Sequence, residues 1–164
     1  MNTSTSYNTM NDRLAATQPI VALALRWALG IAFLSAVADR LGFWGHAGAE
    51  GVSWGNFTAF LEYTALLNPF VPETLIFPLG LFVTITEVVL AAALILGLWT
   101  RQAALASGVL IILFAAGMII GLGIKAPLDY SVFTAAGAAV LLASVSENGW
   151  GIDRWLEQRR AASS

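Results

Sequence analysis

The sequence has no cysteine and few charged residues. Charged residues make up 11% of its 164 residues and hydrophobic residues 58%, against about 25% and about 45–50% in water-soluble domains. The absence of cysteine excludes disulfides, thiolate metal sites and a cysteine nucleophile, and a single histidine excludes a bis-histidine haem within this chain. The net charge of −2 disfavours a nucleic-acid surface, which needs clustered Lys and Arg. We therefore predict a small integral membrane protein.

Apolar windows in the chain predict an all-α, integral membrane four-helix bundle within residues 19–146. A spanning helix needs about 20 mainly apolar residues. The windows that qualify are residues 19–38, 73–98, 102–124 and 128–145. The polar residues 1–18 are predicted to form a disordered tail. Residues 147–164 are predicted to form a cytoplasmic tail with a short surface helix over 152–160, which places Trp150 and Trp155 among the lipid headgroups.

Basic residues predict the orientation of the chain. With four spans both ends lie on one side, together with most of the basic residues: Arg13, Arg101, Arg154, Arg159 and Arg160. The opposite side has Arg40 and Lys125. Because positive residues favour the cytoplasm, both termini are predicted to be cytoplasmic, and the loop 41–72 faces outward.

The outer loop combines glycines at intervals of three with a run of aromatic residues. The glycines are Gly42, Gly45, Gly48 and Gly51, and the aromatic run after them has helical spacing and ends at Pro69. This pattern favours an interfacial or partly re-entrant helix over the outer end of the bundle. The alternative is a loop packed by its own aromatic side chains. Small residues also recur every fourth position along the spans, which indicates either close packing within the bundle or a homo-oligomer face.

Two ionisable residues, Arg26 and Glu87, fall inside predicted spans. A charge near the bilayer centre costs at least about 2.5–3.5 kcal/mol, so we expect the two to pair between antiparallel neighbouring helices. The pair would either fix the register of the two helices or bind and protonate a ligand. In a third alternative Arg26 extends alone to the inner interface. Thr84 and Thr86 could add hydroxyl groups to the same region.

A second polar group is predicted at the outer end. It comprises Asp39, Arg40, Lys125 and Asp129, and the last two are four residues apart and suited to pair. These residues either anchor the helix ends at the membrane interface or, with Trp54 or Glu62, line the entry of a ligand head group that arrives from outside. The lone His46 is predicted to be a surface histidine, and no metal site is predicted.

Several stretches together resemble the DoxX family. They are Leu25-Arg26 with Gly30 and Phe33, Glu87 with Gly97 and Thr100-Arg101, Gly51 to Gly55 with Phe60, and Gly123 to Ser131. Val37, Arg40 and Ala91 depart from the family's pattern. The resemblance implies a four-helix protein of the bacterial inner membrane, similar to the small membrane subunit of thiosulfate:quinone oxidoreductase. It also covers a branch of assembly chaperones.

Combined with the residues, this resemblance implies a quinone-binding subunit that works with a partner oxidoreductase. The chain has no evident redox centre or intrinsic cofactor of its own. Glu87 is the candidate proton relay, and the candidate ligand-binding residues are Arg26, Glu87, Trp54, Lys125 and Asp129. The alternative is a non-enzymatic membrane scaffold or assembly factor, and a small-solute transporter is a weaker third hypothesis.

Overall fold

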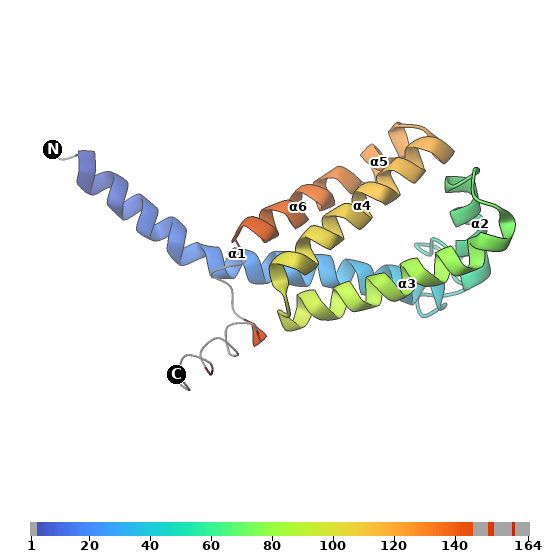
Figure 1. Cartoon of the computed structure of the whole chain (residues 1–164), viewed down its shortest axis with the longest axis horizontal. Coiled ribbons are helices and arrows are strands. Elements are labelled where there is room, and N and C mark those ends of the chain that lie inside the picture. Colours follow the sequence, from blue (N-terminus) through green and yellow to red (C-terminus); the bar gives the residue numbers. More distant parts are fainter. Residues whose placement is uncertain (1–2, 146–150, 153–158, 160–164) are drawn as a thin grey trace.

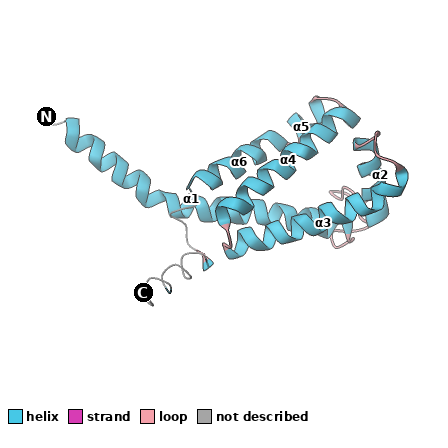
Figure 2. Ribbon diagram, viewed as in Figure 1, coloured by secondary structure: helices cyan, strands magenta, loops and turns pink. Residues whose placement is uncertain are grey.

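The structure is a computed structural model that describes residues 3–145, 151, 152 and 159, with the backbone alone described for 3–15. This part of the chain contains helices and no strands (Figure 2). The helices are α1 (Thr3–Arg40), α2 (Phe57–Leu67), α3 (Glu73–Leu96), α4 (Thr100–Leu122), α5 (Lys125–Asp129) and α6 (Val132–Val145).

Four of these helices pack in a ring. α1 contacts α3, α3 contacts α4, α4 contacts α6, and α6 contacts α1. Leu29 of α1, Leu94 of α3, Leu110 of α4 and Leu142 of α6 belong to the shared core. α2 packs on α3 and α4 at the end opposite the α3–α4 turn (Figure 1). The predicted helical bundle and the predicted helix within its outer loop are confirmed.

Within the described residues, three helices are long and apolar enough to cross a membrane. They are Ala16–Arg40, Glu73–Leu96 and Thr100–Leu122, with 25, 24 and 23 residues. At 1.5 Å per residue each exceeds the hydrocarbon thickness of about 30 Å. Large apolar side chains on their outer faces, including Ile31, Phe82 and Val109, are exposed, as lipid-facing residues should be. The chain is a membrane protein.

The two ends of the chain differ from the expectations. Thr3–Thr17, expected to be disordered, continues α1 as one helix with Pro19 inside it. This stretch has neither glycine nor proline, and extending an existing helix costs far less than nucleating one. The predicted tail helix 152–160, with Trp150 and Trp155, lies almost entirely outside the described residues.

The fourth apolar window is interrupted. α5 ends at Asp129, Ser131 has φ 54°, and α6 begins at Val132. A left-handed residue cannot continue an α-helix, so the window 128–145 becomes two helices. α6 has 14 residues, about 21 Å, which is shorter than the hydrocarbon core. Its crossing of the membrane stays a prediction.

Most of the repeated small residues line contacts between helices. A Cβ atom added to Gly108 of α4 would lie 3.5 Å from Ala139 Cβ of α6, and one added to Gly117 would lie 3.4 Å from Leu67 Cβ of α2. Ala28 and Ala32 of α1 are exposed instead. Close packing within the bundle therefore explains the α4 and α6 positions, and a homo-oligomer face on α1 stays a prediction.

Candidate functional site

Glu87, in the middle of α3, is paired with Arg40 at the end of α1. Arg40 Nη1 bonds Glu87 Oε2, and Nη2 donates to Oε1 at 3.1 Å. Their side chains are 2% and 1% exposed. A two-pronged guanidinium–carboxylate contact of this kind fixes both the distance and the angle between the groups. The pair is therefore a buried, oriented ion pair that connects α1 to α3.

The predicted Arg26–Glu87 pair is wrong. Arg26 is also buried, at 3% exposure, but its Nε donates to the Leu94 carbonyl at 2.7 Å and its Nη2 to the Ile95 carbonyl at 3.0 Å. These carbonyls belong to the last turn of α3, where a helix has acceptors without intrahelical partners and a partial negative charge. Arg26 caps the C-terminal end of α3.

The direction of helical side chains explains the exchange of partners. In an α-helix each side chain leans toward the N-terminus of its own helix. On α1 this turns Arg26 away from Glu87 and turns Arg40 back along the bundle. On the antiparallel α3 it turns Glu87 outward, toward Arg40. Residue depth alone had suggested Arg26, whereas side-chain direction selects Arg40.

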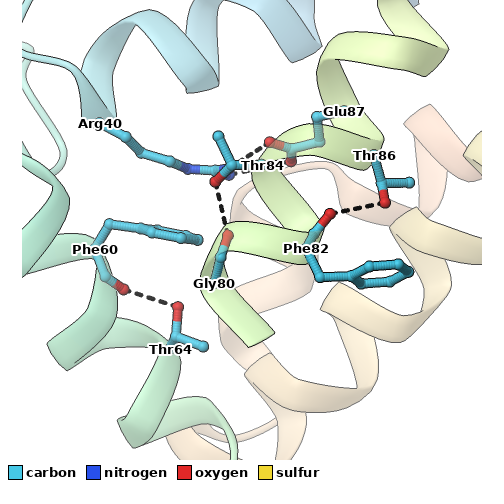
Figure 3. A network of polar contacts seen from close by, with 8 residues as sticks. All are labelled: Arg40, Phe60, Thr64, Gly80, Phe82, Thr84, Thr86 and Glu87. Atoms are coloured by element: carbon cyan, nitrogen blue, oxygen red, sulfur yellow. Dashed lines mark hydrogen bonds and ion pairs between the residues drawn. The ribbon is translucent and has the colours of Figure 1, made fainter. Parts of the chain in front are cut away.

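A shell of aromatic and hydroxyl groups surrounds the Arg40 guanidinium (Figure 3). Its Cζ lies 3.9 Å from the Phe60 ring centroid and 5.1 Å from that of Trp54. Such cation–π contacts strengthen when water is excluded. Nη1 also donates to Thr84 Oγ1 at 3.1 Å, and that hydroxyl donates to the Gly80 carbonyl at 2.8 Å. Thr86 bonds only its own helix, at Phe82.

Asp39, next to Arg40, binds the backbone of the outer loop. Its carboxylate accepts hydrogen bonds from the amides of Ser53, Trp54 and Gly55, at 2.8, 2.9 and 2.8 Å. Gly55 has φ 68°, which allows the chain to turn toward the carboxylate. Trp54 is thereby held with its ring 5.3 Å from that of Phe60. Two adjacent residues of opposite charge thus fasten the loop and α2 to the bundle.

One polar atom of this cluster remains available for a further contact. Within the described part of the chain, Arg40 Nε is the only buried side-chain nitrogen or oxygen without a hydrogen-bond partner. A buried donor left in this state costs about 1–3 kcal/mol. Glu87, by contrast, has both carboxylate oxygens bonded to Arg40, so its predicted use as a proton relay would require this pair to open.

The remaining predicted ligand residues lie elsewhere. Lys125 and Asp129 form the expected pair with each other on the surface of α5. Among the described residues no ion pair or hydrogen bond joins them to Arg40 or Glu87. Of the predicted set the structure brings only Trp54 and Glu87 together, through Arg40. Phe60 and Thr84 complete this Arg40 cluster. Thr84 was expected to add a hydroxyl group near Glu87, whereas the contact of Phe60 with Arg40 was not expected.

Comparison with known proteins identifies a family other than the expected one. Residues 18–129 match the family model of methylamine utilisation protein MauE. No curated protein and no solved structure matches the chain. The DoxX assignment is wrong, because the matching family is MauE and no DoxX model matches. The residues behind that assignment are short, separate groups spread over helices, loops and helix ends, and no single group among them is specific to one family.

Proposed function

The chain belongs to the MauE family, and we propose that it is a bacterial inner-membrane component of a methylamine utilisation system. Within that system we assign it the role of a scaffold or assembly factor for a partner protein. The observation that supports this role is that its intramembrane charged residues bind groups within the bundle. Arg40 and Glu87 bind each other, and Arg26 binds α3 carbonyls, so these groups hold helices together.

The composition of the chain supports the same role. It has no cysteine and one histidine, and His46 is exposed in the outer loop. Electron transfer through this chain would therefore depend on a bound carrier. A scaffold needs only a stable bundle and an outer surface that a partner can contact.

A growth experiment tests whether the chain belongs to a methylamine utilisation system. Timed depletion of the chain tests whether it acts as an assembly factor. Deletion of the gene from a methylamine-using bacterium should abolish growth on methylamine and leave growth on succinate unchanged. For an assembly factor, depletion of the chain after the methylamine-consuming system has formed should leave methylamine consumption intact. Depletion before induction should prevent it. Consumption that stops as soon as the chain is depleted would show a working subunit instead.

A quinone-binding redox subunit is the second candidate, and one observation favours it. Arg40 Nε is a buried donor without a partner, in a cluster that contains the Trp54 ring, and a quinone carbonyl is a suitable acceptor. The discriminating measurement is quinone per purified chain in mild detergent, against an unrelated four-span protein. The scaffold role predicts no excess. Near-stoichiometric quinone that is lost in Arg40→Gln would replace the scaffold role with the redox one.

A further inference from the structure

The end of α1 meets α3 near the middle of α3. Arg26 bonds the α3 carbonyls at Leu94 and Ile95, and Arg40 bonds Thr84 and Glu87. These contacts give the antiparallel register of the two helices. Thr84 lies about eleven residues, or about 16 Å, from the outer end of α3 at Glu73. Because the Arg40 side chain points back along α1, its Cα lies further out than Thr84. With Gly30 beside Ala91, the antiparallel register sets Arg40 level with about residue 81, so α3 continues outward for about a third of its length beyond the end of α1.

The outer loop and α2 occupy the space beside this outer part of α3. Phe57 contacts Phe77, with ring centroids 6.1 Å apart, and a Cβ atom added to Gly80 would lie 3.3 Å from Phe60 Cε1. On the far side α2 packs on α4, where a Cβ atom at Gly121 would lie 3.0 Å from Leu67 Cα. Since α3 and α4 are membrane-spanning helices, α2 lies at a level of the bundle where the outward faces of these helices contact lipid.

An apolar segment at the start of the loop faces away from the bundle at the same depth. Leu41, Phe43 and Trp44 are 59%, 78% and 62% exposed. Gly42, with φ 77°, reverses the chain after α1, and Trp44 Nε1 donates to the Ser35 carbonyl at 3.1 Å. The indole thus lies back along α1, and its one polar group is satisfied, as an indole among lipid chains requires.

We propose that Leu41–Leu67 is a re-entrant segment whose apolar start, Leu41–Trp44, is inserted among the lipid chains of the outer leaflet. Irregular backbone at membrane depth is tolerated only where protein groups satisfy it. In the inserted part, the amides of Leu41, Gly42 and Phe43 donate to carbonyls in the last turn of α1. Further along the loop, the Asp39 carboxylate accepts three amides. The loop tip, with exposed His46 and Glu50, reaches the aqueous side. The Arg40–Glu87 pair then lies near the middle of the bilayer.

Depth-dependent quenching tests this insertion, and the natural absence of cysteine makes the labelling simple. Single-cysteine variants Phe43→Cys and Glu50→Cys carry a fluorescent maleimide in phosphatidylcholine vesicles. One set of vesicles contains lipids brominated along the acyl chain, and the other receives iodide on both sides. Ile31→Cys serves as the lipid-facing reference, and Leu41→Cys replaces Phe43→Cys should that variant not fold.

If Leu41–Trp44 is inserted among lipid chains, the labels at positions 43 and 50 should be quenched by different quenchers. The label at 43 should be quenched by brominated chains as strongly as the label at 31, at a depth of about 5–10 Å or more below the headgroups. The label at 50 should be quenched by iodide. Iodide quenching at 43 equal to that at 50 would overturn the proposal. Protection at 43 from both quenchers would overturn it too, because a second copy of the chain would then cover the segment.

Discussion

The two buried arginines of the bundle contact α3 at different places. Arg26 donates to the carbonyls of Leu94 and Ile95, and Arg40 binds the carboxylate of Glu87. Removing one member of a buried ion pair leaves an uncompensated charge in a medium that solvates it poorly. Glu87 should therefore be energetically coupled to Arg40 and not to Arg26.

A double-mutant cycle should measure this difference. Arg40→Met or Glu87→Leu alone should lower the free energy of unfolding by about 3–5 kcal/mol. The double variant should lose less than the sum, with a coupling of about 1–3 kcal/mol. Arg26→Met and Glu87→Leu should be additive. Denaturant unfolding in detergent, followed by tryptophan fluorescence, gives the free energy of unfolding of each single and double variant. Coupling of Glu87 to Arg26 rather than to Arg40 would contradict the observed pairing.

Gly97 should be less tolerant of substitution than another left-handed glycine. It has φ 70°, and an added Cβ atom would lie 2.7 Å from Arg26 Cζ. Gly123 has φ 85° with nothing within 4 Å of an added Cβ atom. Gly123→Ala should therefore cost only the backbone term, about 1–2 kcal/mol, and Gly97→Ala should cost more. Thermal unfolding compares the two, and equal losses would argue against the Arg26 contact.

At the scale of elements, the sequence predicts the apolar helices better than their ends. Windows at 73–98 and 102–124 correspond to α3 (Glu73–Leu96) and α4 (Thr100–Leu122), because long, mainly apolar runs specify a membrane-crossing helix almost by themselves. Hydropathy does not predict that α1 continues through the polar residues 3–17. It also does not predict the left-handed Ser131 that divides α5 from α6.

A single carboxylate, that of Asp39, accepts three hydrogen bonds from the backbone of the outer loop. Asp39→Ala removes the acceptor for three loop amides, and Asp39→Asn keeps one carbonyl oxygen. Amide hydrogen exchange at Ser53, Trp54 and Gly55 should accelerate in both variants, by more in Asp39→Ala, since hydrogen bonds to charged groups contribute about 1.5–3 kcal/mol. Asp129→Asn, at an exposed pair, is the control and should leave these amides protected. Unchanged exchange in Asp39→Ala would exclude this attachment.

The docking of α2 on α4 requires a small residue at position 121. A Cβ atom there would lie 3.0 Å from Leu67 Cα, so Gly121→Leu should displace α2 and cost about 1–3 kcal/mol. Gly137→Leu on α6 is the matched control, since nothing lies within 4 Å of a Cβ atom at that position. Trp54 is held beside Phe60 of α2, so its fluorescence should shift in the first variant alone. A shift in Gly137→Leu of equal size would contradict the assignment of Gly121 to α2 docking.

At the scale of the whole molecule, three parts of the chain meet at one end of the bundle. The α3–α4 turn lies at the end where α1 enters the bundle, opposite α2 (Figure 1). The chain after α6 returns there too, because a Cβ atom added to Gly151 would lie 3.1 Å from Arg26 Nη1 and from Gly97 Cα. This arrangement fits an even number of crossings, with both termini on one side.

The burial of Arg40 also strengthens the charge asymmetry behind the predicted orientation. Arg40 is neutralised by Glu87 inside the bundle and no longer counts as a loop charge, which leaves Lys125 as the exposed basic residue of the outer side. The inner side keeps Arg13, Arg101 and the basic residues of the C-terminal stretch. Because loop Lys and Arg set orientation, the termini should be cytoplasmic.

Single cysteines in the cysteine-free chain can test this orientation in intact spheroplasts. A membrane-impermeant maleimide should label Glu50→Cys and Lys125→Cys before lysis, and Arg101→Cys and Ser163→Cys only after it. The reverse pattern would show that the bundle is inverted. Labelling of Ser163→Cys but not Arg101→Cys before lysis would show that the fourth apolar segment does not cross. In that case α5 and α6, with 5 and 14 residues, would lie within the membrane without spanning it.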